Sequence, residues 1–205
     1  MRRVNTYAIA SGACFALFFL ASALRGVLSG VDAWLARLVE GGAGGSMLTV
    51  WRFLSLPGDP YLLLAATILV LWWGVLGRKQ WEVYSLVALI SGGLVLAALS
   101  KVVVNSPRPD SSVLFFSGPG YPSAHVTLAV VFWGWFFLTF SQSAERKRLL
   151  FASLVAVVCG VALSRVVLLA HFGSDVLGGV LLGLFWLFAV AAAKESLVAK
   201  SAPPR

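Results

Sequence analysis

The chain has 205 residues, of which 60% are hydrophobic and only 12% are charged. A soluble domain carries about 25% charged residues, so this composition excludes a soluble globular protein. The formal net charge of +8 would suggest nucleic acid as a partner of a soluble chain. Here the basic residues lie in short loops between apolar runs, so membrane topology and anionic lipid explain them and nucleic acid is not expected.

Six apolar runs approach the roughly 20 residues that a helix needs to cross a bilayer. They cover about residues 7–25, 60–77, 81–101, 123–141, 148–170 and 175–194. Because backbone groups cannot remain unpaired in lipid, each run is expected to be a helix. We therefore predict an all-α fold, a six-span transmembrane helix bundle that forms a single domain over residues 1–205.

The first run allows two interpretations. Arg2 and Arg3 precede it and Ala21-Ser22-Ala23 closes it, which is also the pattern of a cleavable signal peptide. We favour an uncleaved span, because the run is long for a signal peptide and Ser11 and Gly12 interrupt it early.

The segment between the first and second spans has a different pattern. Over residues 31–40 the apolar residues recur at helical spacing, and the charged residues, among them Asp32, occupy the opposite side. This pattern predicts a short interfacial helix at the membrane surface, which the glycine-rich residues 41–45 end. The polar tail at 195–205 is predicted to be disordered.

The distribution of the sixteen Lys and Arg residues predicts the orientation of the chain. Ten lie on the side of the two termini, and six lie on the other side. Three of those six, Lys101, Arg108 and Arg165, are candidate functional residues and are left out of the count. The remaining excess of ten against three predicts cytoplasmic termini in a plasma (bacterial inner) membrane, with the loops 1–2, 3–4 and 5–6 facing outward.

Three polar clusters lie next to the outward ends of the spans. The first contains Lys101, Arg108 and Pro109, the second contains Pro122, Ser123, Ala124 and His125, and the third contains Ser164, Arg165, His171 and Asp175. Because all three clusters lie on one side of the membrane, they can meet although they are far apart in sequence.

The cations of these clusters suit a phosphate ligand. Arg108 and Arg165 offer bidentate contacts to phosphate, and Lys101 offers a point charge. Ser123 stands at the expected first turn of the fourth span, where free backbone N–H groups bind anions. The sequence therefore predicts a phosphate-binding site at the outward face.

The two histidines suggest the chemistry of that site. His125 and His171 suit acid and nucleophile roles, and Asp175 could hold the His171 ring. Arg165 lies about 100° around a straight helix from Ser164, so either Arg165 reaches sideways or the helix unwinds near His171. The outward carboxylates do not cluster in sequence, so we expect neither a metal site nor a cofactor.

Together, the clusters resemble the three-part signature of the type 2 phosphatidic acid phosphatase (PAP2) superfamily, which includes membrane lipid phosphatases and soluble vanadium haloperoxidases. The K-x6-R-P part matches Lys101, Arg108 and Pro109, the P-S-G-H part matches Pro122, Ser123 and His125, and the S-R-x5-H-x3-D part matches Ser164, Arg165, His171 and Asp175. The departure is Ala124, which replaces a glycine. Alanine cannot reach positive φ cheaply, but the start of a helix would suit it.

This resemblance implies a role for each residue. His171 would attack phosphorus to form a phosphohistidine, Asp175 would orient His171, and His125 would protonate the leaving oxygen and later activate water. The residues that would hold the phosphoryl oxygens are Lys101, Arg108, Ser123, Ala124 and Arg165, while Pro109, Pro122 and Ser164 would support the motif.

The predicted function is a metal-independent lipid phosphate or diphosphate phosphatase that acts at the outer face of the membrane. Polyprenyl (undecaprenyl) diphosphate is the leading substrate, and phosphatidylglycerol phosphate, phosphatidic acid and lipid A phosphates are the alternatives. A phosphotransferase that passes the group to a lipid alcohol also remains open, whereas a transporter is disfavoured because the polar groups collect at one face. The expected partners are the lipid substrate and membrane lipids, and the oligomeric state is left open.

Overall fold

The computed structural model describes residues 2–42, 44–110 and 118–201, and in these ranges every regular element is a helix. The elements in chain order are α1 (Arg2–Ala23), α2 (Arg25–Val39), α3 (Met47–Ser55), the 3₁₀ turn η1 (Leu56–Gly58), α4 (Pro60–Leu76), α5 (Gln80–Val104), α6 (Ala124–Phe140), α7 (Ala144–Val167) and α8 (Gly173–Ser201). The predicted all-α class is therefore confirmed, and a helix occupies each of the six apolar runs.

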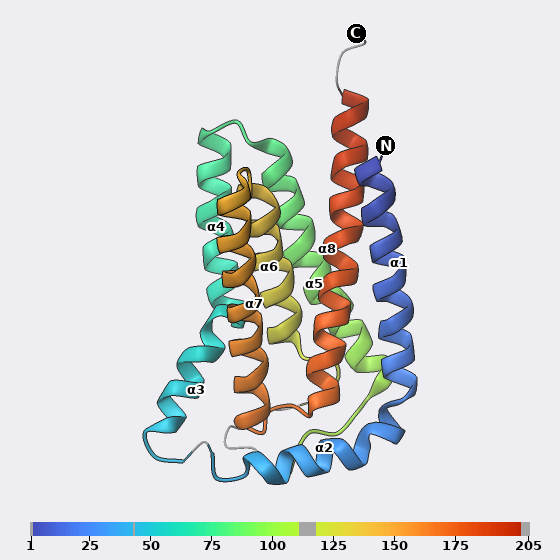
Figure 1. Cartoon of the computed structure of the whole chain (residues 1–205), viewed down its shortest axis with the longest axis vertical. Coiled ribbons are helices and arrows are strands. Elements are labelled where there is room, and N and C mark those ends of the chain that lie inside the picture. Colours follow the sequence, from blue (N-terminus) through green and yellow to red (C-terminus); the bar gives the residue numbers. More distant parts are fainter. Residues whose placement is uncertain (1, 43, 111–117, 202–205) are drawn as a thin grey trace.

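The six long helices run along one axis, and α2 lies across one end of the bundle (Figure 1). Both chain termini lie at the opposite end, and α1 lies beside α8 (Figure 1). A hydrogen bond from Ser11 Oγ to the Phe185 carbonyl, 3.1 Å long, joins these two helices. At the end of the bundle where α2 lies, three helices end, α1, α5 and α7, and α8 begins.

Length and hydropathy identify the membrane-spanning helices. Among the described residues, α1, α5, α7 and α8 are long and apolar enough to cross a membrane, and the pair 47–58 and α4, bent by 42°, would make a fifth span. The helix α6 is apolar but has only 17 residues, which is about 25 Å of helix. The chain is a multi-pass membrane protein, although this criterion does not reach the predicted count of six spans.

The helix α6 forms the centre of the bundle. Most of its residues from Val126 to Trp135 are buried, and they pack against α5, α7 and α8. Glycines on α8 allow a close approach: a Cβ atom at Gly179 would lie 2.7 Å from the Ser123 carbonyl oxygen, and one at Gly183 would lie 2.7 Å from Val130. These contacts fix the starts of α6 and α8 against each other.

Two sequence predictions need correction. The tail predicted as disordered continues α8 through residue 201, because Leu197, Val198 and Ala199 extend the apolar helical pattern past Lys194; residues 202–205 lie outside the described ranges. Asp32, predicted to lie on the polar side of a surface helix, is buried, and its two oxygens accept hydrogen bonds from the N–H and hydroxyl of Ser174. The first turn of α8 has free N–H groups that need such an acceptor.

Candidate active site

The three polar clusters meet at the α2 end of the bundle, away from the termini (Figure 1). The first cluster stands at the end of α5 and in the segment that follows it, the second starts α6, and the third joins α7 to α8. Residues more than 70 positions apart in sequence therefore share one site.

His171 lies in the turn that joins α7 to α8. The helix α7 ends at Val167, Leu169 adopts a left-handed conformation with φ of +51°, and the N–H groups of Ala170 and His171 both donate to the carbonyl of Arg165 at 3.0 and 3.2 Å. The helix thus unwinds before His171, which confirms one of the two arrangements that the sequence allowed.

The surroundings of the His171 ring define its tautomer. Nδ1 lies 3.4 Å from Asp175 Oδ2, and Nε2 lies 3.3 Å from Arg108 Nη1. A guanidinium only donates hydrogen bonds, so the Nε2 that faces it carries the lone pair and Nδ1 carries the proton. Burial, reinforced by the positive charges of Arg108, Arg165 and Lys101, lowers the pKa of His171 well below its usual value. The ring is a neutral imidazole whose Nε2 is a competent nucleophile.

Backbone carbonyls hold two of the predicted phosphate-binding cations. Lys101 Nζ donates to the carbonyls of Pro119 and Gly120 at 2.7 and 3.1 Å. Arg108 donates through Nε to the Gly118 carbonyl at 3.0 Å and through Nη1 to the Ala170 carbonyl at 2.7 Å. The carbonyl groups of the segment 118–120 therefore hold both cations on the side of His171.

Gly120 must be glycine in this arrangement. A Cβ atom there would lie 2.8 Å from Asp175 Oδ2 and 2.9 Å from the Pro107 carbonyl oxygen, closer than van der Waals contact allows. The missing side chain lets the 118–120 segment lie directly against the carboxylate that faces His171.

The start of α6 supplies a second wall of the site. Ser123 is fully buried, its N–H donates to the Asp175 carbonyl at 3.0 Å, and its Oγ has no hydrogen-bond partner among the described residues. Ala124 is the first residue of α6 and is not among the residues with positive φ. Alanine therefore stands here without strain, as the sequence suggested, and the buried Ser123 hydroxyl has its hydrogen-bonding capacity unused among the described residues.

His125 lies in the first turn of α6, with its side chain 20% exposed. Its Nε2 is 3.7 Å from Oδ2 of Asp59. The other oxygen of Asp59 caps α4 by accepting from the N–H groups of Tyr61 and Leu62, both at 3.0 Å. Asp59 thus combines a helix cap with a charge that faces His125.

A pocket of about 480 Å³ opens beside His125, and its lining includes Arg165, Asp59, Ser55 and Arg52. Arg165 is 3% exposed, and its Nη1 donates to Ser55 Oγ at 2.8 Å. This pocket gives a substrate access to His125 and to one of the three predicted cations.

The remaining predicted residues support the backbone. Ser164 is fully buried and its Oγ donates to the Val161 carbonyl at 2.7 Å. Pro122 is fully buried, and Pro109 is also buried. These side chains shape the turns that carry the charged groups.

The structure adds residues that sequence reasoning missed. Arg25, which was counted only as a topology signal, forms a 2.9 Å ion pair with Asp175, and Asp59 and Ser55 join the site from the α3–α4 region. An Asp-Pro pair at 59–60 indicates a helix start, but no sequence pattern connects it to His125. Long-range contacts of this kind leave no local signal.

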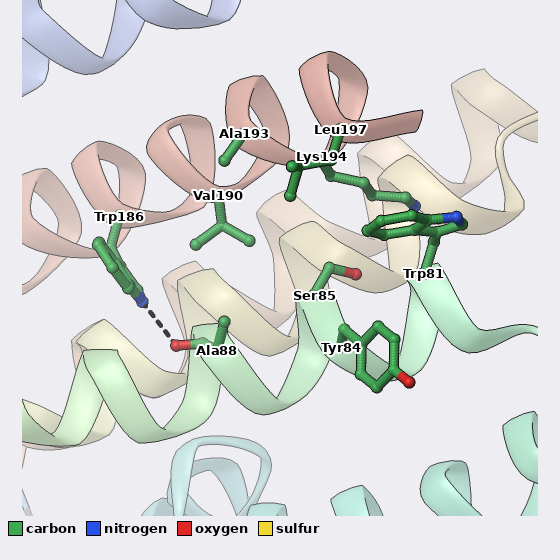
Figure 2. Close-up of a pocket in the computed structure, with 9 residues that line it drawn as sticks. All are labelled: Trp81, Tyr84, Ser85, Ala88, Trp186, Val190, Ala193, Lys194 and Leu197. Carbon is green, nitrogen blue, oxygen red and sulfur yellow. Dashed lines mark hydrogen bonds between the residues drawn. The ribbon is translucent and has the colours of Figure 1, made fainter. Parts of the chain in front are cut away.

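A separate cavity of about 310 Å³ lies between α5 and α8. Figure 2 shows it flanked by Trp81, Trp186 and Lys194, with Trp186 donating to the Ala88 carbonyl, and Lys194 pairs with Glu82. Its lining is almost wholly apolar and includes no histidine, so it is not the candidate active site. Among the described residues, no group of three or more His, Cys, Asp or Glu side chains could hold a metal ion.

The region that carries the three clusters also matches a known protein family. A family model described as the PAP2 superfamily matches residues 81–197, the region that contains all three clusters. Phosphatidylglycerophosphatase B of Bacillus subtilis (strain 168) is 30% identical over 127 residues, an alignment that covers 58% of this chain and 62% of that protein. The chain therefore spans less than two thirds of this curated relative.

Two solved structures share the fold. A transmembrane PAP2 type phosphatidylglycerolphosphate phosphatase from Bacillus subtilis superposes with a TM-score of 0.82, covering 96% of this chain and 99% of that one. LpxE of Aquifex aeolicus superposes with a TM-score of 0.62, covering 78% and 94%. Both are 21% identical to this chain, so these similarities concern the fold.

Proposed function

This chain belongs to the PAP2 superfamily, and from its site geometry we propose that it is a lipid phosphatase that works through a phosphohistidine at His171. One observation carries the proposal: the bare Nε2 of a buried, neutral His171 faces Arg108, while Nδ1 faces Asp175. A nucleophile placed beside a phosphate-binding cation is the arrangement that attack on phosphorus requires.

The reaction proceeds in two steps. In the first, His171 Nε2 forms a bond to phosphorus as the bond to the lipid oxygen breaks, and His125 gives a proton to that oxygen. In the second, His125 takes a proton from water, whose oxygen attacks phosphorus as the bond to His171 breaks and inorganic phosphate leaves. Lys101, Arg108 and Arg165 neutralise the phosphoryl oxygens in both steps, so catalysis comes from positioning and charge.

We propose phosphatidylglycerophosphate as the first substrate to test, because the curated relative is named for that activity. Polyprenyl (undecaprenyl) diphosphate, the leading substrate from sequence, stays a prediction. Phosphatidic acid, lipid A phosphates and transfer to a lipid alcohol remain the alternatives. Purified protein should be incubated with each lipid phosphate, and released inorganic phosphate should be measured with no alcohol acceptor added. Failure to release phosphate from any of them would refute the hydrolase proposal.

We propose that all six predicted helices cross the membrane, with the termini in the cytoplasm and the site outside. Both termini lie at one end of the bundle (Figure 1), as an even number of spans requires. In a background lacking Cys14 and Cys159, Ser46→Cys near the site end should be labelled by an impermeant maleimide in intact cells, and Gln142→Cys should be labelled only after permeabilisation. The reverse pattern would place the site in the cytoplasm.

A further inference from the structure

We propose that Arg25 is a positioning residue for catalysis, holding one oxygen of Asp175 so that the other orients His171. This inference rests on the proposed function, since it assigns the part that Arg25 plays in the same reaction. Arg25 lies outside the three-part signature and outside residues 81–197 that match the family model.

The contacts of Asp175 show how its two oxygens are divided. Oδ1 accepts from Arg25 Nη2 at 2.9 Å. Oδ2 accepts from the Phe172 N–H at 3.1 Å and lies 3.4 Å from His171 Nδ1. Asp175 has no exposed surface, so in the intact protein its Oδ1 depends on Arg25 and not on solvent. Without Arg25, the carboxylate could turn or take up a proton, and either change would release His171 from its Nδ1–H tautomer.

Arg25 is itself held in a fixed position. Its guanidinium carbon lies 4.7 Å from the centroid of the Tyr121 ring, a favourable cation–π distance. The buried Tyr121 is fixed in turn through a 2.7 Å hydrogen bond between its hydroxyl and Ser22 Oγ. The corner between α1 and α2 therefore presents Arg25 to the catalytic carboxylate as a preorganised group.

The same face of α2 makes a second contact with α8. Asp32 lies seven residues after Arg25, two turns along the helix and on the same side, and it accepts hydrogen bonds from the N–H and Oγ of Ser174 at 2.9 and 2.6 Å. Arg25 and Asp32 together dock α2 on the first turn of α8. Arg25 Nε also lies 3.5 Å from Ser174 Oγ, but of this pair only Arg25 contacts Asp175. Arg25 therefore both docks α2 and holds the carboxylate, whereas Asp32 has the docking role alone.

The first test reads the His171 ring directly and needs no turnover. The chain has two histidines, so ¹⁵N-histidine labelling in detergent gives a simple spectrum, which a His125→Gln variant assigns. In the otherwise unchanged chain, His171 should show the Nδ1–H tautomer. Arg25→Met should shift it towards a mixture of tautomers, Arg25→Lys should restore it in part, and Arg37→Met, which removes an exposed cation from the same helix, should leave it unchanged. An unaltered His171 spectrum in Arg25→Met would overturn the proposal.

The second test separates positioning from folding. Arg25→Met should lower kcat by about 10²-fold, the scale of loss expected from misplaced reacting groups, with little change in KM. In an Asp175→Asn background the same substitution should lower kcat much less, because its effect passes through the carboxylate. Equal losses in both backgrounds would show a general structural role and refute the proposal. Release of phosphate by the unsubstituted chain tests the proposed function separately, and if that fails the tautomer measurement still decides the role of Arg25.

Discussion

The two histidines occupy contrasting surroundings, although each faces an aspartate. His171 is 3% exposed and lies in the turn between α7 and α8, whereas His125 is 20% exposed and lines the open pocket at the start of α6. A nucleophile needs a fixed ring and a single bare nitrogen, and enclosure provides both. A general acid must exchange protons with a leaving group and with water, and the open pocket gives that access.

The aspartates differ in what holds them. Both accept hydrogen bonds from backbone N–H groups at the start of a helix, Asp175 from Phe172 and Asp59 from Tyr61 and Leu62. Asp175 has in addition the ion pair with Arg25, so the His171 pair belongs to a network of charged side chains, whereas the His125 pair rests on a helix cap. Substitutions that remove one histidine–aspartate pair and keep the other can test whether the two pairs have the distinct roles we assign.

The largest expected effect comes from His171→Ala, which removes the nitrogen that we propose as the nucleophile. Loss of a covalent nucleophile costs on the order of 10⁶-fold in kcat, so turnover should vanish on a lipid phosphate and on p-nitrophenyl phosphate. No phosphoryl-enzyme should form when the variant is quenched with ³²P-labelled substrate. Turnover that survives in a folded His171→Ala protein would rule out the covalent mechanism.

His125→Ala should have a smaller effect that depends on the leaving group. General acid catalysis contributes about 10²–10⁴-fold, and a lipid alkoxide needs the proton more than p-nitrophenolate does. The variant should lose most activity on the lipid substrate, retain part of it on p-nitrophenyl phosphate, and accumulate phosphohistidine at His171. If His125→Ala lowers the turnover of the two substrates by the same factor, His125 is not the general acid.

Asp59→Asn should lower turnover moderately, and the size of the loss should depend on the leaving group as it does for His125→Ala. Asparagine caps a helix about as well as aspartate, so stability should hold, whereas Asp59→Ala should also lose about 0.5–2 kcal/mol. The negative charge that faces His125 disappears in both variants. Lipid phosphate turnover should fall more than p-nitrophenyl phosphate turnover in Asp59→Asn, measured beside its thermal stability. A loss seen only in Asp59→Ala would assign Asp59 to helix capping alone.

Chelation should have the smallest effect of all. The proposed mechanism uses Lys101, Arg108 and Arg165 where other phosphatases use metal ions. Activity in excess EDTA should equal activity without it, and vanadate, which can adopt the five-coordinate geometry of the transferring phosphorus, should inhibit. Loss of activity in EDTA with recovery on adding magnesium would contradict this mechanism for both histidines.

The sequence by itself determined the all-α class, the positions of the six apolar helices and the side of the bundle on which the polar clusters meet. It did so because these properties follow from local features: apolar length, helical spacing and the order of short motifs along the chain. The same local reasoning gave unwinding of the helix before His171 as one of two arrangements and allowed Ala124 at a helix start, and the structure has the unwound helix and Ala124 as the first residue of α6.

Only the tertiary structure decided which groups hold Asp175 and the two histidines in place. Arg25 and Asp175 are 150 positions apart in sequence, and Asp59 and His125 come from different helices, so their pairing depends on how α2 and α4 pack against α6 and α8. The burial of the Asp32 side chain has the same origin. The first turn of α8 needs a hydrogen-bond acceptor, and this need overrides the polar surface pattern of α2. Contacts of this kind arise when distant helices bury their polar ends together, and no spacing within one helix encodes them.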